Sequence, residues 1–491
     1  MKVIVCIGNN LKYDTRVKRH IKSIARHGHQ VHVIASPVPD SRYGLKETES
    51  MSHVFSEYRP QEPPINDEIM DFAKVFGLEE VFLNSFPILA SSSYYNPPDL
   101  ERYTKELYRR VRGGRWKDIV SRISEEMSDE IALSYPMRFF EKSVQFAKDV
   151  LKYEADVVLC NDEDTLLAGV VHKLKYKSRL IYDFHDLMAD ISDGVFPQMY
   201  SNVLTLFEKQ MIQHADAVMS VSESELLWSK AHYDFQAPAV AILNCSAAEV
   251  SPQMRTSKRT QTERIRLYYH GMCDYSRGLF ELLEAIKQFD QFVLVLRCLP
   301  SDILEEIRKK VSEERLEDKV IFLEPVSAEK IPEAANRDGD IGFAFCKTDK
   351  CLNWQFALQN KFIEYVKAGL PVITSATKEQ AKIVKQYQIG WVLEENSVEG
   401  IIITLKRILK ERDQILRMTK NSFCAADREF DWKIYDKVLN AVIVKDRSVI
   451  RKYAISFKRN RRILAEWNKE DLENGHVIKK KGFWENLEMM K

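Results

Sequence analysis

The chain has 491 residues, of which 45% are hydrophobic, and this suits two or three domains with cores of ordinary size. Its 73 lysines and arginines balance its 72 aspartates and glutamates, so the net charge of +1 gives no overall field that would favour nucleic acid. No run of about 18 apolar residues could span a bilayer, and no signal-peptide pattern precedes the first strand-like run, so we expect a cytoplasmic protein.

The eight cysteines are scattered, and none belongs to a C-x-x-C pair. Several stand inside apolar, strand-like runs, as Cys6 and Cys160 do. We therefore expect reduced, buried thiols rather than a disulfide framework.

The first 35 residues have the pattern of a β-α-β unit, with strands predicted over 1–7 and 31–35 and a helix over about 14–27. Gly8 follows the first strand, at the edge of the sheet where doubly wound folds bind ligands. The three-glycine dinucleotide fingerprint is absent, so we do not expect a site of the NAD type.

The alternation of predicted strands and helices is interrupted over about 41–147. This stretch is rich in Pro, Tyr and charged residues, and we interpret it as a helical insertion. Its second half is basic, with Tyr103, Tyr108 and Trp116 interleaved. Two interpretations stay open, a solvated helical face and a surface for an anionic acceptor.

Two strands predicted over 155–160 and 179–184 each end in polar residues. Asp162 and Asp164 formally match the D-x-D motif whose carboxylates hold a divalent ion on a donor diphosphate. We discount a metal because these carboxylates begin a helix, where aspartate serves as a cap. Asp183 and His185 lie at the end of the second strand.

The most informative segment is 360–374, an amphipathic helix followed by a Gly-Pro turn and an apolar strand. Asn360 and Lys361 stand at the positive end of this helix, where donors suit a phosphate. Glu364 lies one turn further on and can accept hydrogen bonds from a pair of ribose hydroxyls. The pattern predicts a sugar-nucleotide site.

This segment resembles the signature P-N-K-x-x-E-Y-x-x-x-G-x-P-V of GT-B glycosyltransferases, in particular the retaining family 4, with Gln359 in place of Pro. Asp14-x-Arg16 and Asp183-x-His185 are similar to further family segments, although Asp14 also suits a helix N-cap. The resemblance covers about residues 1–40 and 150–440. It implies an α/β GT-B fold, with two Rossmann-like doubly wound domains facing across a cleft and a C-terminal crossover helix.

The resemblance also implies the domain organisation and the roles of individual residues. The predicted parts are an acceptor domain over 1–248, a hinge over 249–262, a nucleotide-sugar domain over 263–428, a crossover helix over 429–444 and a tail over 445–491. The predicted donor-binding residues are Gly8, Arg277, Asn360, Lys361 and Glu364. The predicted catalytic residues are His185, Arg277 and Lys361, and the acceptor-side residues are Asp14, Arg16, Asp162 and Asp183. We expect neither a metal ion nor a cofactor besides the nucleotide-sugar substrate.

The chain departs from the family pattern at two places. In the turn after the first strand of the second domain, Met272 stands at the Arg position of the phosphate clamp, and Arg277 fills the Lys position. Phe356 stands eight residues before Glu364, where the family has a first glutamate, and it cannot accept hydrogen bonds from a sugar. Both departures affect the predicted contacts with the donor and do not affect the predicted fold.

The resemblance implies a metal-independent, hexosyltransferase-like enzyme. It would move a sugar from a nucleoside-diphosphate sugar to a glycan or lipid-linked acceptor with retention, in surface polysaccharide or glycoconjugate synthesis. Two alternatives stay open. One is a sugar-nucleotide 2-epimerase of the same fold, and the other is a scaffold subunit whose site has decayed, as Met272 and Phe356 would suggest.

The tail carries eight basic and two acidic residues over 445–467, a local charge of +6. Its apolar residues recur at helical spacing, a pattern that suits an anionic membrane surface. We therefore predict peripheral association with the inner face of the membrane. The alternative is that the apolar face packs on the first domain.

Overall fold

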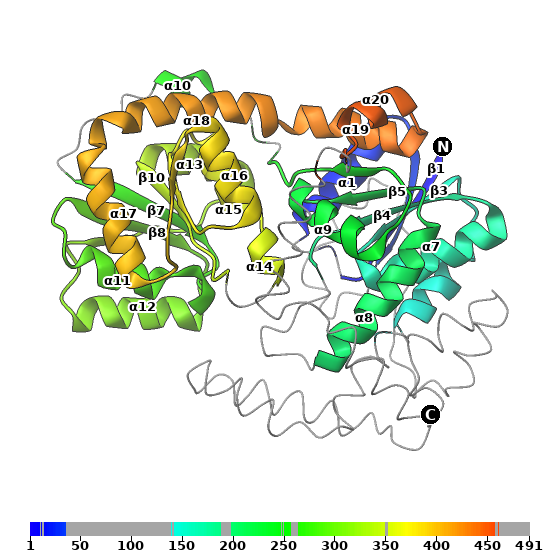
Figure 1. The fold of residues 1–491 in the computed structure, drawn as a ribbon, viewed down its shortest axis with the longest axis horizontal. Helices are drawn as coiled ribbons and strands as arrows, with labels where there is room; N and C mark the ends of the chain where they lie inside the picture. The colour runs from blue at the N-terminus through cyan, green and yellow to red at the C-terminus, as the bar shows by residue number, and fades with distance from the viewer. Residues whose placement is uncertain are drawn as a thin grey trace, which may run out of the picture. The chain divides into compact units, whose positions relative to one another are not determined.

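The computed structural model describes residues 1–9, 11, 14–35, 139, 142–187, 198–246, 248, 250–256, 264–348, 352–456 and 460. The chain forms two compact units, one of Met1–Ile242 with Asp436–Lys491 and the other of Leu243–Tyr435 (Figure 1). The predicted insertion lies almost entirely outside the described residues, which include a helical stretch at its end, 142–150.

The first unit is built on a parallel sheet in the order β2-β1-β3-β4-β5-β6. Its strands are β1 (Lys2–Ile7), β2 (Gln30–Ala35), β3 (Val157–Asn161), β4 (Arg179–Phe184), β5 (Ala217–Ser220) and β6 (Ala239–Ala241). Its helices are α1 (Thr15–Arg26), α7 (Glu163–Tyr176), α8 (Gln198–Met211), the short η4 (Ile212–His214) and α9 (Glu223–Tyr233). Strand order reverses between β1 and β3, so the carboxyl ends of these two strands mark the switch point at which doubly wound sheets bind ligands.

The second unit repeats this plan in the order β12-β11-β10-β7-β8-β9. Its strands are β7 (Ile265–Gly271), β8 (Phe292–Cys298), β9 (Val320–Phe322), β10 (Ile341–Ala344), β11 (Val372–Thr374) and β12 (Gly390–Val392). Its helices are α10 (Pro252–Thr256), η5 (Tyr275–Arg277), α11 (Leu279–Ile286), α12 (Asp302–Glu313), η6 (Ala328–Lys330), α13 (Ile331–Asp338), α14 (Leu352–Phe356), α15 (Asn360–Lys367), α16 (Lys378–Tyr387), α17 (Val398–Lys410), η7 (Arg412–Gln414) and α18 (Ile415–Glu429). Here the order reverses between β7 and β10.

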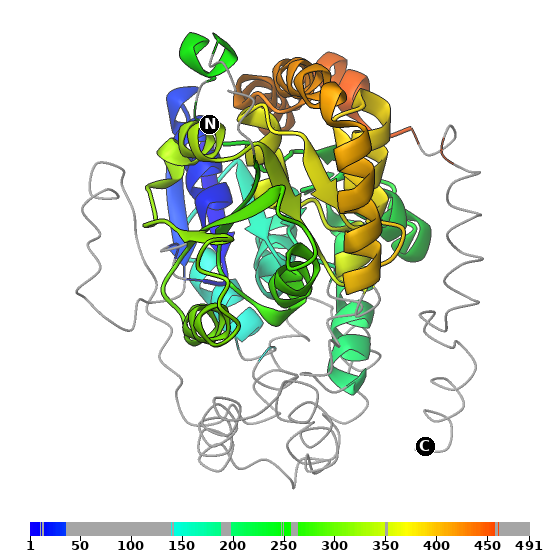
Figure 2. The same ribbon diagram turned by 90° about the vertical axis from the view of Figure 1, so that its left-hand side faces the viewer.

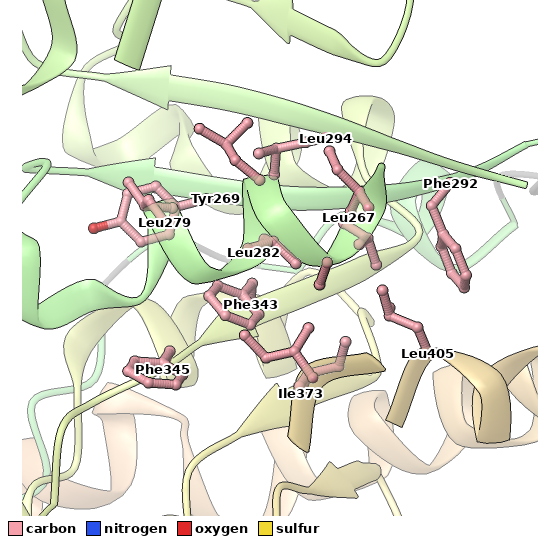
Figure 3. Close-up of a cluster of buried hydrophobic side chains, with 14 of the residues drawn as sticks. Leu267, Tyr269, Leu279, Leu282, Phe292, Leu294, Phe343, Phe345, Ile373 and Leu405 are labelled. Atoms are coloured by element: carbon pink, nitrogen blue, oxygen red, sulfur yellow. The ribbon is translucent and has the colours of Figure 1, made fainter. Parts of the chain in front are cut away.

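The core of the second unit lies between its sheet and the helices α11, α12 and α17. Leu267 and Tyr269 of β7 point to this side and pack with Leu282 and Leu405 (Figure 3). Because side chains alternate along a strand, Tyr268 and His270 point to the opposite face, which α13 and α15 cover. Figure 2 shows helices on both sides of this sheet.

Gly278 is required at the start of α11. Its φ of +67° lies in the left-handed region, and a Cβ there would come within 2.5 Å of the Phe345 ring. This glycine therefore lets the loop that carries Arg277 approach the end of β10.

The C-terminal part of the chain returns from the second unit to the first. Helix α19 (Trp432–Val444) has residues in both, and α20 (Arg447–Tyr453) follows it. Within the first unit, Asp436 accepts a hydrogen bond from Ser23 (2.6 Å), and the Ile455 N–H donates to Ala239 of the edge strand β6 (2.9 Å). None of the described helices is both long and apolar enough to cross a membrane.

The thiols agree with the sequence expectation with one exception. The described cysteines form no disulfide, and all are buried except Cys424 on α18, which is exposed. The prediction that the thiols are buried is therefore wrong for Cys424, because this residue lies on an exposed face of its helix.

Candidate functional site

Three of the predicted donor-site residues come together at the carboxyl ends of β7 and β10. Arg277 ends η5, which follows β7, while Lys361 and Glu364 lie on the first turns of α15. Glu364 is joined to the end of β7 by a hydrogen bond from His270. These side chains therefore surround the switch point of the second sheet.

Arg277 and Lys361 are the basic side chains of this site, and the Glu364 carboxylate lies near Lys361. The Lys361 ammonium lies 3.7 Å from the centre of the Tyr269 ring. Burial, and then the neighbouring Arg277 guanidinium, hold the pKa of Lys361 well below its usual value. In the described part of the chain, neither cation has an ion pair or a hydrogen bond. A guanidinium beside a buried amine, which a bound anion would help to keep protonated, creates a site for an anion with several oxygens.

The start of α15 is fixed by Gln359, the residue that replaces the family's proline. Its side-chain Nε2 donates to the Phe345 carbonyl just beyond β10 (3.0 Å), and its backbone N–H donates to Gln380 (2.9 Å). Asn360, the first residue of the helix, is exposed. The amide therefore replaces a rigid ring with two hydrogen bonds and still presents the N-terminus of α15.

Phe356 and Met272, the two residues that depart from the family pattern, differ in their exposure to solvent. Phe356 is 1% exposed and belongs to the packing of α14, so its ring is not available to a ligand. Met272 is 66% exposed, and its carbonyl accepts a hydrogen bond from Tyr269 (2.5 Å).

His270 is a site residue that the sequence analysis missed. Its Nε2 lies 2.7 Å from Glu364 Oε2, and the two side chains are 5% and 16% exposed. In the sequence, His270 is recognisable only as a histidine just before Gly271, at the end of a predicted strand. Its contact with Glu364 becomes apparent only in the structure, which places the end of β7 near α15.

In the first unit, Asp183 and Arg16 form a buried ion pair. Arg16 on α1 donates from Nε (3.1 Å) and Nη2 (2.6 Å) to the carboxylate, and the side chains are 3% and 0% exposed. Although burial alone would raise the pKa of Asp183, Arg16 and two histidines hold it well below its usual value. Since both side chains are buried, their direct effect is on the neighbouring His185.

His185 lies between two carboxylates. Its Nδ1 is 3.3 Å from Asp162 Oδ2, its Nε2 is 3.5 Å from Asp183 Oδ2, and its backbone N–H donates to Asp162 Oδ1 (3.0 Å). Burial would lower the pKa of His185, but the two carboxylates raise it to about 9. Burial raises the pKa of Asp162 to about 7, against the effect of His185. The ring is therefore held in place and carries a proton at neutral pH.

The expectation that Asp162 caps a helix needs correction. Asp162 occupies the N-cap position of α7, but its side chain makes no capping hydrogen bond because it holds His185 instead. Its φ is +62°, an uncommon value for a residue other than glycine. Asp164 forms an ion pair with Lys142 (2.6 Å). The two carboxylates of the D-x-D string thus have different partners.

Gly8 and Asp14 have local structural roles. The Gly8 carbonyl accepts from Lys142 (2.6 Å), and a Cβ on Gly8 would lie 1.9 Å from an Asp164 carboxylate oxygen. Asp14 Oδ1 accepts from the Val17 N–H (2.9 Å), so its predicted N-cap role is confirmed. Among the residues that the structure describes, no group of three His, Cys, Asp or Glu side chains is placed to hold a metal ion.

His20 is a second residue that the sequence analysis missed. It lies one turn after Arg16 on α1, is fully buried, and its Nδ1 is 3.3 Å from Asp183 Oδ2. Burial lowers the pKa of His20 to about 4, so this ring stays neutral while His185 is charged.

We predict a pH dependence of stability that His185 causes. Its pKa in the folded state, about 9, lies above the ordinary 6.5, so its contribution is complete below pH 6.5 and is lost as the pH rises to 9. Between pH 7 and 9, the free energy of unfolding should fall on the order of 2 kcal/mol more in the wild type than in His185→Asn. Urea denaturation at several pH values measures this. Equal slopes for the two proteins would contradict the assignment.

Residues 250–423 match the family model described as Glycosyl transferases group 1. This segment resembles the group 1 glycosyltransferases. This matched segment lies in the second unit and contains Arg277, Lys361, Glu364 and His270. A comparison with curated proteins gave no match.

Solved structures share the architecture of most of the chain. Sucrose-phosphate synthase from Thermosynechococcus elongatus is 14% identical with a TM-score of 0.59, and the match covers 91% of this chain and 99% of that one. HepE from Anabaena in complex with UDP is 13% identical with a TM-score of 0.58, covering 91% and 100%. A glycosyltransferase from Rickettsia africae is 11% identical with a TM-score of 0.54, covering 92% and 98%. The segment that matches the group 1 model is thus part of the predicted GT-B fold with two Rossmann-like domains.

Proposed function

We propose that this protein transfers a glycosyl group from a nucleoside-diphosphate sugar to a glycan or lipid-linked acceptor, with retention of the anomeric configuration. The observation that carries the proposal is that two basic side chains, Arg277 and Lys361, lie beside Glu364 at the switch point of the matched segment and form no ion pair with a described residue. Two positive charges suit a diphosphate, and the carboxylate suits the diol of a ribose. We place the reaction in surface polysaccharide or glycoconjugate synthesis.

The chemistry follows from where charge develops. The bond between the sugar carbon and the diphosphate oxygen breaks, the acceptor oxygen bonds to the same carbon, and the acceptor proton leaves with the diphosphate. Arg277 and Lys361 would stabilise the negative charge on the departing diphosphate without reorganising. Asn360 and the backbone amides near Gly8 would add donors to that diphosphate, Glu364 would anchor the ribose, and His185 would lie near the reacting carbon. We assign no base.

A series of nucleotides tests the proposal. HepE was solved with UDP and with UDP-glucose, so UDP is the first candidate for this chain. Thermal shift and calorimetry with UDP, GDP, ADP and CDP should show one preferred nucleotide, and transfer from its sugar should need an acceptor. Product formed from the donor without any acceptor would indicate the 2-epimerase. Binding without turnover would indicate a scaffold subunit, and no binding of any nucleotide would overturn the proposal.

We predict that binding and turnover survive strong chelation of divalent ions, because the positive charges at the diphosphate come from Arg277 and Lys361. Assays with and without EDTA should agree within twofold. Activity that EDTA abolished and manganese restored would contradict this prediction and would favour Asp162 and Asp164 as metal ligands.

We further propose that the basic tail docks on an anionic membrane surface. Within its described part, Ile450 is buried, while Arg451 and Lys452 on α20 are exposed. Each basic residue near an anionic surface is worth about 1 kcal/mol. Truncation after Val444 would also remove the pairing of Ala454 and Ile455 with β6, so charge reversal is the better test.

The double variant Arg451→Glu/Lys452→Glu should sediment at least about tenfold more weakly with phosphatidylserine-containing vesicles at low salt. The matched control is Lys406→Glu/Lys410→Glu on α17, which makes the same change of charge at exposed positions. Equal sedimentation of the two variants, or none for the wild type, would show that the tail is structural only.

A further inference from the structure

The hydrogen bond between His270 and Glu364 joins two elements of the proposed donor site. His270 is the penultimate residue of β7, Glu364 is on α15, and the atoms Nε2 and Oε2 are 2.7 Å apart. A carboxylate is an acceptor only, so Nε2 carries the hydrogen. The carboxylate is thereby fixed at one of its two oxygens.

The His270 ring has little freedom to turn away. Its backbone N–H donates to the Tyr365 hydroxyl (3.2 Å), and the ring packs edge to face on Tyr365 with centroids 5.0 Å apart. Tyr268 lies 5.8 Å away on the same strand. With only 5% of the side chain exposed, the ring is held by packing, and Nε2 is directed at Glu364.

The second carboxylate oxygen of Glu364 remains available. Within the described residues, no hydrogen bond to Oε1 is formed, and the side chain keeps 16% of its surface exposed. An oxygen with two lone pairs can accept from two vicinal hydroxyls. A flexible glutamate would lose rotamer entropy on binding, and a glutamate already fixed by His270 loses less.

We propose that His270 is a positioning residue for nucleotide recognition, which holds Glu364 so that its free oxygen meets the ribose diol of the donor. The inference rests on the proposed function and deepens it, because it identifies the ribose diol as the part of the nucleotide that Glu364 recognises. A merely structural hydrogen bond between β7 and α15 would stabilise the unit without any preference for ribose.

The test compares UDP with 2′-deoxy-UDP in wild type and variants by calorimetry. His270→Leu fills the space but has no donor, whereas the amide of His270→Gln can still reach Oε2. Tyr268→Phe is the control, because it removes a hydrogen bond with Arg297 from the same strand without touching Glu364. Glu364→Gln serves as the reference for a lost ribose contact.

We expect the wild type, Tyr268→Phe and His270→Gln to prefer UDP over 2′-deoxy-UDP by about tenfold, the scale of one hydrogen bond to a charged group. His270→Leu and Glu364→Gln should lose most of this preference. In turnover assays, His270→Leu should raise the KM for the donor by about tenfold with kcat changed less than threefold. If His270→Leu does not fold, His270→Asn replaces it, because its shorter amide cannot reach Oε2.

A full ribose preference in His270→Leu or His270→Asn would overturn the inference. So would an equal loss of preference in Tyr268→Phe, since that loss would reflect general loosening of β7. A wild type that binds none of the four nucleotides would instead overturn the proposed function itself, so the two failures are distinguishable.

Discussion

Replacing Arg277 by alanine is expected to lower turnover roughly 100-fold or more, the scale for removing one preorganised donor from a developing anion. The guanidinium has no ion pair or hydrogen bond within the described residues, so its removal leaves none of them without a partner. It also lies close enough to Lys361 to lower the pKa of that residue. The loss should therefore appear in kcat, while the thermal midpoint should change little.

Two comparisons make this prediction specific. Arg407→Ala removes an arginine from the surface of α17, where its guanidinium is 60% exposed and paired with Glu411, and should leave turnover unchanged. Glu364→Gln should mainly weaken nucleotide affinity, because its contact with the ribose is the same in the ground state and the transition state. If Arg277→Ala bound and turned over the donor like the wild type, the site assignment would be wrong.

Replacing Asp183 by asparagine is expected to destabilise the first unit by about 3–5 kcal/mol, since it leaves the Arg16 guanidinium buried without its counter-charge. Asp183 is fully buried and also lies near His20 and His185. The pKa of Asp183 is well below its usual value, so its contribution is present at pH 7 and is lost only when acid protonates it. Urea denaturation at pH 7 measures the effect.

The control is an exposed arginine–aspartate pair. Arg255 and Asp427 also form an Nη2–Oδ1 contact of 2.6 Å, but their side chains are 38% and 56% exposed. Asp427→Asn should therefore cost less than about 1 kcal/mol. If the two substitutions had equal effects, burial would not be what gives the Asp183 pair its importance.

The architecture was predictable because its signals are local. Apolar runs of five to seven residues, each followed by an amphipathic helix, predicted β1, β3 and β4 within a residue or two of their bounds. The N-cap role of Asp14 was equally local, since a capping side chain bonds to a backbone amide three residues on. The segment at α15 was readable because its site residues lie within one and a half turns of a single helix.

The roles of the carboxylates in the first unit were not predictable in the same way. The sequence placed Asp162 and Asp164 at a helix start, which is correct for the backbone, but it did not show that one holds His185 and the other pairs with Lys142. A carboxylate at a helix start has several possible partners, and the choice depends on which strand end lies beside it.

The sequence by itself therefore determined the two parallel α/β units and one half of the donor site, because periodicity, caps and a contiguous motif act over a few residues. Only the tertiary structure decided the contacts between distant residues, such as Arg16 with Asp183 and His270 with Glu364, which are 167 and 94 residues apart. Such pairs arise from the order of strands in a sheet and the face to which each side chain points. Strand order is fixed by the packing of the whole unit, so local sequence patterns do not predict it.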